Sequence, residues 1–322
     1  MIKKSLMLIL LFTSTSVGQA PNKALYQHLQ DVSVTVKSFA GEGSGVIVTR
    51  EITNADGKKE KVNFVWTAAH VVDGLRSARV VIKDGKPTTV VEFKDAQIVK
   101  ELVEGGRRVG EIKMEAKVIK YSDADNGEDL ALLMVRKKGF IDKTTIFHAP
   151  DDSVAIGTEL YHVGSLLGQV GSNSMTRGIL SQIGRVLDLG TGDGVVFDQT
   201  SCPGFPGSSG GGVFLSERTK GHEGHYVGML VRGAGETFNL IVPVRRMRKY
   251  AKANDVLWAI DQNAPTPTYE KLLSLPVEGT IDSKGAGKGK SSRTSTRFPF
   301  LFRDSTTPGK ISPFLPRRPV ED

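Results

Sequence analysis

The stretch Pro206-Gly-Ser-Ser-Gly-Gly-Gly212 places two adjacent serines in a turn that is otherwise almost entirely glycine. Glycines leave the backbone N–H groups of such a turn accessible, and these groups can stabilise a developing negative charge. Two earlier segments carry matching chemistry: Val65-Trp-Thr-Ala-Ala-His-Val-Val72 supplies His70, and Glu128-Asp-Leu-Ala-Leu-Leu133 supplies Asp129. Each of these side chains is predicted to lie where a strand meets a turn.

His, Asp and Ser, in this chain order, are the set of residues that acyl transfer at neutral pH requires. A serine hydroxyl becomes an effective nucleophile when an imidazole takes its proton, and a buried carboxylate holds that imidazole in the right tautomer. Asp129 is preferred because it directly opens an apolar strand, where it can be buried against an imidazole. The competing carboxylates, in a polar loop, are Asp123, Asp125 and Glu128. The competing histidines, interpreted as structural or solvated, are His28, His148 and His162.

The rest of the chain is patterned for an all-β fold. Val32, Val34 and Val36 alternate with polar residues, which is the period-two signature of a strand. Many further short apolar segments, among them 78–82 and 89–93, are separated by turn residues, which indicates an antiparallel sandwich or barrel. Residues 22–30 predict a short helix, and residues 244–260 predict one amphipathic helix.

Four further segments extend the pattern of the three motifs. They are Gly43-Ser-Gly-Val-Ile-Val48, Gly164-Ser-Leu-Leu-Gly168 followed by Thr176-Arg-Gly-Ile-Leu-Ser181, Gln199-Thr200, and Phe238-Asn-Leu-Ile-Val-Pro-Val244. With the motifs in this order, the sequence from about residue 32 to 252 resembles the trypsin-like (chymotrypsin-fold) serine proteases. It is most similar to their HtrA-type bacterial branch.

The resemblance implies a fold of two six-stranded antiparallel β-barrels with a C-terminal helix, and a catalytic cleft between the barrels. It aligns His70 with the general base, Asp129 with the orienting carboxylate and Ser209 with the nucleophile. The oxyanion hole would comprise Gly207, Ser208 and Ser209, with amides from the first and third and Ser208 between them. The implied function is serine endopeptidase activity on polypeptide substrates through an acyl-enzyme, with no cofactor and no metal.

The resemblance is incomplete around the nucleophile. HtrA-type enzymes usually have Asn at the position of Ser208 and an Asp-Ala pair at Ser201-Cys202. After the protease region, no segment resembles the peptide-binding PDZ-like module of that branch. The departures concern loop conformation and substrate preference rather than the three aligned catalytic residues.

The same alignment predicts the residues of the specificity pocket: Pro203, Phe205, Val231, Arg232, Gly233 and Asn239. Family members that cut after Lys or Arg carry an aspartate six residues before the nucleophile, where this chain has Pro203. Because an unpaired cation is costly to bury, we expect cleavage after small or aliphatic residues. In a competing hypothesis, Arg232 turns into the pocket and selects acidic residues. Cys202 is expected in a pocket wall, where a bulky thiol reagent would block catalysis.

The two ends of the chain differ from its middle. Residues 1–20 show a basic start, a short apolar run and small residues, which predict a secretory signal peptide and hence a periplasmic or secreted protein. Residues 21–260 form the predicted protease domain, without a membrane span. Residues 261–322 are rich in Pro, Gly, Ser and basic residues and predict a mostly disordered tail.

The formal net charge of +8 comes largely from this tail, whose residues from Ser283 onward include nine Lys/Arg and three Asp/Glu. The remainder of the mature chain is near neutrality, so no nucleic-acid partner is expected. The sequence is compatible with either a monomer or an oligomer. One cysteine excludes an internal disulfide framework.

Two other interpretations compete with an unrestricted protease. One is a narrowly specific processing or self-processing protease, and the other is a non-enzymatic binding module on a protease fold. A third possibility, a metal site at His222-Glu-Gly-His225, is disfavoured because zinc-protease motifs place two residues between Glu and His on a helix. This segment is instead expected to be a surface hairpin between strands.

Overall fold

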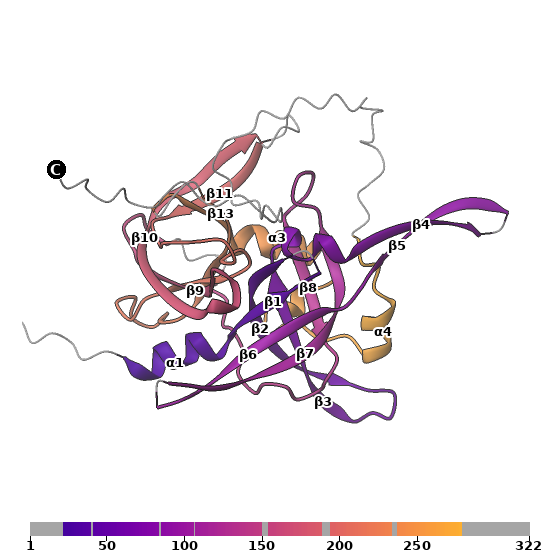
Figure 1. The fold of residues 1–322 in the computed structure, drawn as a ribbon, viewed down its shortest axis with the longest axis horizontal. Helices are drawn as coiled ribbons and strands as arrows, with labels where there is room; N and C mark the ends of the chain where they lie inside the picture. The colour runs from indigo at the N-terminus through magenta and orange to yellow at the C-terminus, as the bar shows by residue number, and fades with distance from the viewer. Residues whose placement is uncertain are drawn as a thin grey trace, which may run out of the picture.

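The fold is that of a computed structural model, which describes residues 22–39, 41–83, 85–105, 107–149, 154–188, 194–233 and 237–278 (Figure 1). The predicted signal peptide and the tail beyond residue 278 lie outside these residues. Two closed antiparallel barrels of six strands each lie side by side. The predicted all-β, double-barrel fold with a C-terminal helix is confirmed.

The first barrel, coloured indigo to magenta in Figure 1, combines six strands from the first half of the chain. In sheet order they are β1 (Ser33–Lys37), β2 (Glu42–Thr53), β3 (Lys59–Thr67), β8 (Leu130–Val135), β7 (Arg107–Ser122) and β6 (Ala96–Glu104). The pairing of β1 with β6, in which Val36 lies opposite Ile98, closes the ring. The six residues of β8 are all buried, so both faces of this strand are covered.

The second barrel follows in the pink and orange part of the chain. Its sheet order is β10 (Gly171–Asp188), β11 (Gly194–Thr200), β14 (Asn239–Pro243), β13 (Tyr226–Gly233), β12 (Gly212–Leu215) and β9 (Glu159–Leu166). The pairing of β9 with β10 closes this ring. Register shifts in β10 and β13 show where the strands bend to curve the sheet.

Two strands belong to neither barrel. β4 (Arg76–Lys83) and β5 (Lys86–Phe93) form a separate two-stranded ribbon that projects from the first barrel (Figure 1). The sequence predicted strands in both places. Period-two patterning does not distinguish a barrel strand from a free hairpin, which is why their placement needed the structure.

Short helices complete the fold. α1 (Lys23–Asp31) begins with Asn22, whose side chain accepts a hydrogen bond from the backbone of Leu25, as an N-cap residue does. α2 (Ala69–Val72) and the 3₁₀ turn η1 (Asp73–Leu75) follow β3, and η2 (Gly168–Val170) follows β9. The C-terminal helix α3 (Val244–Ala253) is shorter than predicted, because the chain leaves it at Asn254 and Asp255 and forms a separate turn, η3 (Leu257–Ala259).

The first residues of the segment assigned to the tail are part of the described structure. Residues 261–278 lie along the first barrel and include a further helix, α4 (Tyr269–Ser274), in which Leu272 is buried. Backbone contacts hold this segment, because Tyr121 N–H donates to the carbonyl of Val277. The side chain of Arg76 also pairs with Glu278 at 2.6 Å. The segment Pro265-Thr-Pro-Thr268 therefore runs along the barrel surface, where the hydroxyl of Thr266 donates to the carbonyl of Glu51.

A continuous hydrophobic core joins the two barrels and the C-terminal helix. Trp66, fully buried near the end of β3, donates through its indole N–H to the carbonyl of Ala259 at 2.9 Å. Phe64 packs edge-to-face on Trp258 with ring centroids 4.6 Å apart. These contacts fix the end of β3, from which the chain enters α2 and His70.

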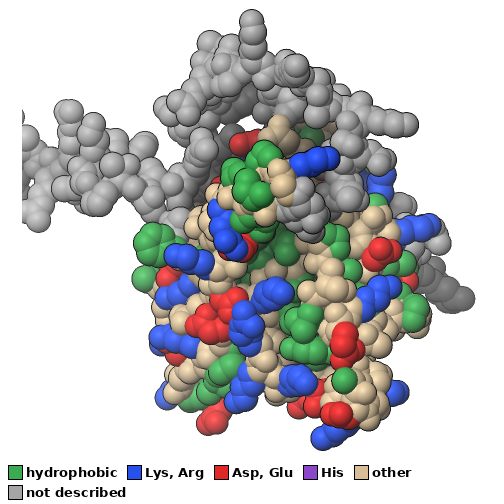
Figure 2. Space-filling model, turned by 90° about the vertical axis from the view of Figure 1, so that its right-hand side faces the viewer, with side chains coloured by type: hydrophobic (Ala, Val, Ile, Leu, Met, Phe, Trp, Pro, Cys, Tyr) green, Lys and Arg blue, Asp and Glu red, His purple; other side chains and the backbone are tan. Residues whose placement is uncertain are grey.

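The surface has mixed charge. On the described part of the face in Figure 2, basic and acidic side chains alternate without a continuous basic patch. Several of the charges are paired across the fold, as in Arg76 with Glu278 and Lys61 with Asp142. No helix within the described residues combines the length and the apolar character that crossing a membrane requires.

Candidate active site

The three sequence motifs meet where the two barrels face each other. His70 lies in α2 directly after β3, Asp129 immediately precedes β8, and Ser209 lies in the turn before β12. β3 and β8 are paired neighbours, so Thr67 and Ala131 lie opposite each other and bring His70 and Asp129 together. The site therefore takes two residues from the first barrel and one from the second.

Asp129 and His70 form the hydrogen-bonded pair that the sequence predicted. The ring Nδ1 of His70 lies 3.0 Å from both carboxylate oxygens of Asp129, and the backbone N–H of His70 donates to Oδ1 at 3.2 Å. An ionised carboxylate only accepts hydrogen bonds, so Nδ1 carries the proton and Nε2 keeps its lone pair. Asp129 is buried, whereas one third of the His70 side chain is exposed and can meet a substrate.

The conformation and charge of Asp129 both suit this role. Its φ of +54° is in the left-handed region, which Asp tolerates better than most residues, and this conformation turns the carboxylate back toward α2. Burial by itself would raise the pKa of Asp129, but the contact with His70 and the charge of Arg232 together hold that pKa below its ordinary value. The carboxylate therefore stays ionised at neutral pH.

The turn that carries Ser209 is held against the first barrel by Ser44. The backbone N–H of Ser44 donates to the carbonyl of Ser209 at 2.7 Å, and its hydroxyl donates to the carbonyl of Gly207 at 2.7 Å. Gly210 has a φ of +88°, and a β-carbon there would lie 2.1 Å from the carbonyl oxygen of Ser44. Only glycine fits this position, so the predicted glycine-rich turn is required by close packing between the barrels.

The backbone N–H groups of Gly207 and Ser209 point away from the hydrogen bonds that stabilise the turn. The carbonyl of Pro206 accepts from the backbone of Leu167, and the carbonyl of Ser208 accepts from Gly211. In a trans peptide the N–H lies opposite the carbonyl, so the amides of Gly207 and Ser209 face the other way. Neither amide has a hydrogen-bond partner among the described residues. Ser208 differs, because its own N–H donates to Phe205 and its hydroxyl accepts from that residue.

Arg232 has a different neighbourhood from the one that the competing hypothesis assumed. Its guanidinium donates to the carbonyl of Ala124 at 2.8 Å, in the loop that precedes Asp129. The side chain thus reaches from β13 to the first barrel and adds positive charge near Asp129. This contact disfavours the hypothesis that Arg232 turns into the specificity pocket.

Among the remaining predicted pocket residues, the side chains of Val231 and Asn239 are buried, whereas Pro203 and Phe205 belong to the loop before the nucleophile turn. Val231 is buried in the core, so only its backbone is available to a substrate, and Asn239 is buried with its side chain donating to the carbonyl of Cys202 at 2.8 Å. A β-carbon on Gly204 would touch Asn239 and Leu230, which places Asn239 directly behind the loop 203–206. The carbonyl of Pro203 accepts from the hydroxyl of Thr176, and the side chain of Phe205 is exposed. Gly233 ends β13 opposite Asn239.

Cys202 and His162 are both fully buried. Cys202 is fully buried in the core of the second barrel, and burial raises the pKa of its thiol to about 11. We therefore expect the thiol of the folded protein to be out of reach of a bulky reagent. His162 is also fully buried, behind the nucleophile turn, and its Nδ1 lies 3.1 Å from the carbonyl oxygen of Gly212. Burial lowers the pKa of His162 to about 4.

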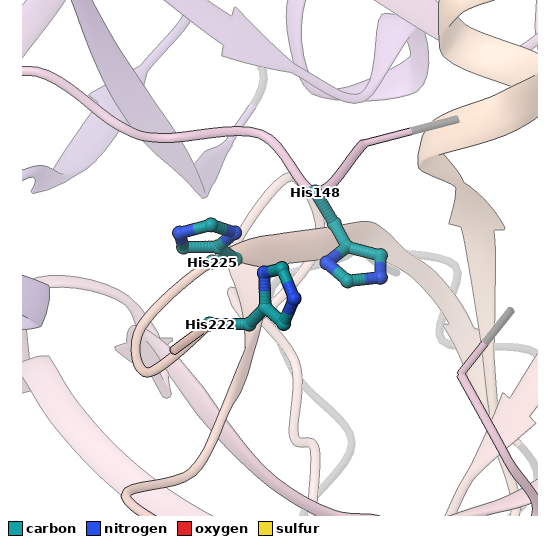
Figure 3. A group of neighbouring side chains, drawn as sticks. All are labelled: His148, His222 and His225. Atoms are coloured by element: carbon teal, nitrogen blue, oxygen red, sulfur yellow. The ribbon is translucent and has the colours of Figure 1, made fainter. Parts of the chain in front are cut away.

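Among the described residues, one group of side chains could hold a metal. The nitrogen ligand atoms of His148, His222 and His225 all lie within 4.8 Å of one another (Figure 3). Residues 222–225 do lie in the turn between β12 and β13, as expected for a hairpin. The sequence prediction of no metal overlooked His148, which is distant along the chain and is carried by the segment between the barrels.

Sequence reasoning also missed Ser44 as the residue that joins the nucleophile turn to the first barrel. Ser44 lies near the start of β2. The one available signal was the Gly-Ser-Gly pattern, because Gly43 admits the close approach of Val71 and of the Ser209 carbonyl.

Comparison with known proteins identifies the domain. Residues 43–222 match the family model of the trypsin-like peptidase domain, a span that includes His70, Asp129 and Ser209. No match was found among curated proteins.

Similar solved structures are proteases at low sequence identity. The crystal structure of Deg5 is 19% identical, with 74% of this chain and 95% of that chain covered and a TM-score of 0.48. The MamO protease domain from Magnetospirillum magneticum is 18% identical, with coverage of 70% and 98% and a TM-score of 0.46. The HtrA-type protease AlgW, in complex with a tripeptide, is 17% identical, with coverage of 71% and 62% and a TM-score of 0.47.

Proposed function

Because the chain belongs to the trypsin-like peptidase family, we propose that it is a serine endopeptidase that cleaves polypeptides through an acyl-enzyme. The observation that carries the proposal is the pairing of His70 Nδ1 with the buried carboxylate of Asp129 at 3.0 Å, beside a turn that presents Ser209. This arrangement provides a base in a defined tautomer, and the family match spans all three residues.

In the proposed mechanism, His70 Nε2 takes the hydroxyl proton of Ser209 as Oγ attacks the substrate carbonyl carbon. The amides of Gly207 and Ser209 stabilise the resulting oxyanion, and His70 then gives its proton to the leaving amine. Water next attacks the acyl carbon and loses a proton to His70, which returns it to Ser209 Oγ as the acyl–oxygen bond breaks, so that the free enzyme is regenerated. Asp129 keeps the imidazole oriented and stabilises its cationic form throughout.

For substrate preference we propose cleavage after small or aliphatic residues. Pro203 brings no charge to the position that carries an aspartate in enzymes cutting after Lys or Arg, and Arg232 is bound to Ala124. A cationic substrate side chain would be left without a partner there. We also propose export from the cytoplasm, on the strength of the signal-like residues 1–20.

The test is labelling with a fluorophosphonate probe, which reacts with activated serines. The wild-type protein should be labelled at Ser209, as located by fragmentation of the labelled peptide, and Ser209→Ala should not be labelled. Ser274→Ala, which changes an exposed serine of α4, serves as the control and should be labelled like the wild type. Labelling that persists in Ser209→Ala would contradict the assignment of the nucleophile.

The same proteins distinguish the two alternatives. A folded wild-type protein that the probe does not label would favour a binding module. Removal of the C-terminal tail in the wild type but not in Ser209→Ala, seen by intact mass, would favour a self-processing protease.

A further inference from the structure

Three of the six histidines of this chain lie together, away from the proposed catalytic residues. The ring centroids of His148 and His222 are 5.2 Å apart, those of His222 and His225 are 5.0 Å apart, and those of His148 and His225 are 6.0 Å apart. Figure 3 shows the three rings turned toward one another, with His222 drawn between the other two. His148 is buried, and its two neighbours are half-buried.

The backbone around these rings is fixed by short hydrogen bonds. The N–H of His222 donates to Thr219 at 3.0 Å, and that of His225 donates to the carbonyl of His222 at 3.1 Å, so both histidines lie on successive tight turns. The N–H of His148 donates to the carbonyl of Tyr226 at 2.9 Å. This bond attaches the segment between the barrels to the first residue of β13. The backbone positions of all three histidines are thus held by hydrogen bonds.

The set of donors selects one class of metal. Three imidazoles suit Zn²⁺, Cu²⁺ and Ni²⁺, whereas Ca²⁺ and Mg²⁺ prefer oxygen ligands. Zinc–nitrogen bonds of about 2.0–2.1 Å in a tetrahedron place the nitrogens about 3.3 Å apart. The observed upper limit of 4.8 Å can close to that distance by small rotations of the half-buried rings of His222 and His225.

The cluster is separate from the proposed catalytic site. β13 begins at Tyr226, beside the histidines, whereas its Leu230 accepts a hydrogen bond from Gly210, next to Ser209. Four residues of strand separate these two points by roughly 13 Å. The two sites thus lie at opposite ends of the hairpin formed by β12 and β13.

We propose that His148, His222 and His225 bind a divalent transition-metal ion, with Zn²⁺ as the best fit, and that solvent supplies the fourth ligand. The ion connects the inter-barrel segment to the turn between β12 and β13, two parts of the chain that are 74 residues apart at His148 and His222. Its role is to stabilise the fold, because an ion that binds only the folded arrangement shifts unfolding to higher temperature.

The proposal can be tested with ZnCl₂ on untagged protein that has been stripped of metal with EDTA. Isothermal titration should give one Zn²⁺ per chain with a dissociation constant of about 1 μM or less, and a saturating amount of Zn²⁺ should raise the melting temperature by several degrees. His222→Ala and His225→Ala should each weaken binding by about a hundredfold or more and remove the thermal shift. CaCl₂ should produce neither effect.

The matched control is His28→Ala, which removes a half-buried histidine of α1 outside the cluster. It should bind Zn²⁺ like the wild type. Melting curves in EDTA establish that each variant is folded, and His225→Gln replaces any alanine variant that is not. The proposal is overturned if the wild type shows no saturable Zn²⁺ binding, if binding survives in both turn variants, or if His28→Ala loses it equally.

Discussion

Two groups of imidazoles in this protein have opposite surroundings. His70 faces the buried, ionised carboxylate of Asp129, which fixes its tautomer and stabilises its cationic form. His148, His222 and His225 face one another, and the described group contains no carboxylate or thiol ligand. The same side chain is therefore suited to proton transfer in one place and to metal binding in the other. The difference between the two uses is whether a buried carboxylate, such as that of Asp129, faces the imidazole.

The largest effect is expected when the carboxylate is removed from the first group. Asp129→Asn should lower kcat by roughly 10⁴-fold, because an amide can donate to Nδ1 and stabilise the wrong tautomer of His70. Ser209→Ala and His70→Ala should each lose about as much, since the three residues act as a unit. Peptide hydrolysis measured on folded variants is the test, with circular dichroism as the control. A loss below tenfold in Asp129→Asn would contradict the proposed role of the carboxylate.

His162 offers a third kind of imidazole, buried without any carboxylate partner among its described contacts. Its pKa of about 4 in the folded protein lies below the ordinary value of 6.5. Below pH 6.5 the unfolded chain binds a proton that the folded chain does not, so stability falls as the pH decreases from 6.5 to 4. Between pH 7.5 and pH 5 the free energy of unfolding should drop by about 2 kcal/mol through this residue.

Urea unfolding at both pH values measures this drop. His162→Gln is the comparison, because it lacks the titrating group and should show a smaller pH dependence by about the same amount, whatever its absolute stability. An identical pH dependence in the two proteins would mean that His162 does not titrate between pH 5 and pH 7.5.

Substitution of Arg232 tests whether a positive charge near Asp129 affects catalysis in addition to the pair that Asp129 forms with His70. Arg232→Ala removes the bond to Ala124 and a positive charge near the carboxylate, and should lower kcat/KM by about three- to tenfold. Profiling with a peptide library should show the same preference for small or aliphatic residues in both proteins. A preference for acidic residues that disappears in Arg232→Ala would restore the hypothesis that this side chain enters the pocket.

The smallest effect is expected at Cys202, a buried thiol whose described hydrogen-bond contact is the carbonyl of Leu160. Its burial and its pKa of about 11 should keep the thiol unreactive in the folded protein. At pH 8, an aromatic disulfide reagent should label it only after denaturation, and activity should not change during exposure of the folded enzyme. Rapid labelling of the folded protein, with loss of activity, would place the thiol in the pocket wall after all.

Several features of the fold were predictable because they depend on neighbouring residues. The alternation of Val32, Val34 and Val36 covers β1 and the residue that precedes it. Helix α1 begins directly after its N-cap residue, Asn22. Other features depended on packing partners. The ribbon of β4 and β5 has strand patterning but no place in a barrel, and residues 261–278 look like a linker until the surface they cover is known.

By itself, the sequence determined which residues carry the proposed chemistry of the site. His70, Asp129 and Ser209 lie in short motifs whose strand-to-turn setting is local, and local pattern is what a sequence expresses directly. Only the tertiary structure decided that Ser44 holds the nucleophile turn, that Arg232 points to Ala124, and that His148 joins the two turn histidines. Each of these depends on barrel closure, which brings side chains distant along the chain within bonding distance, and no local pattern encodes that distance.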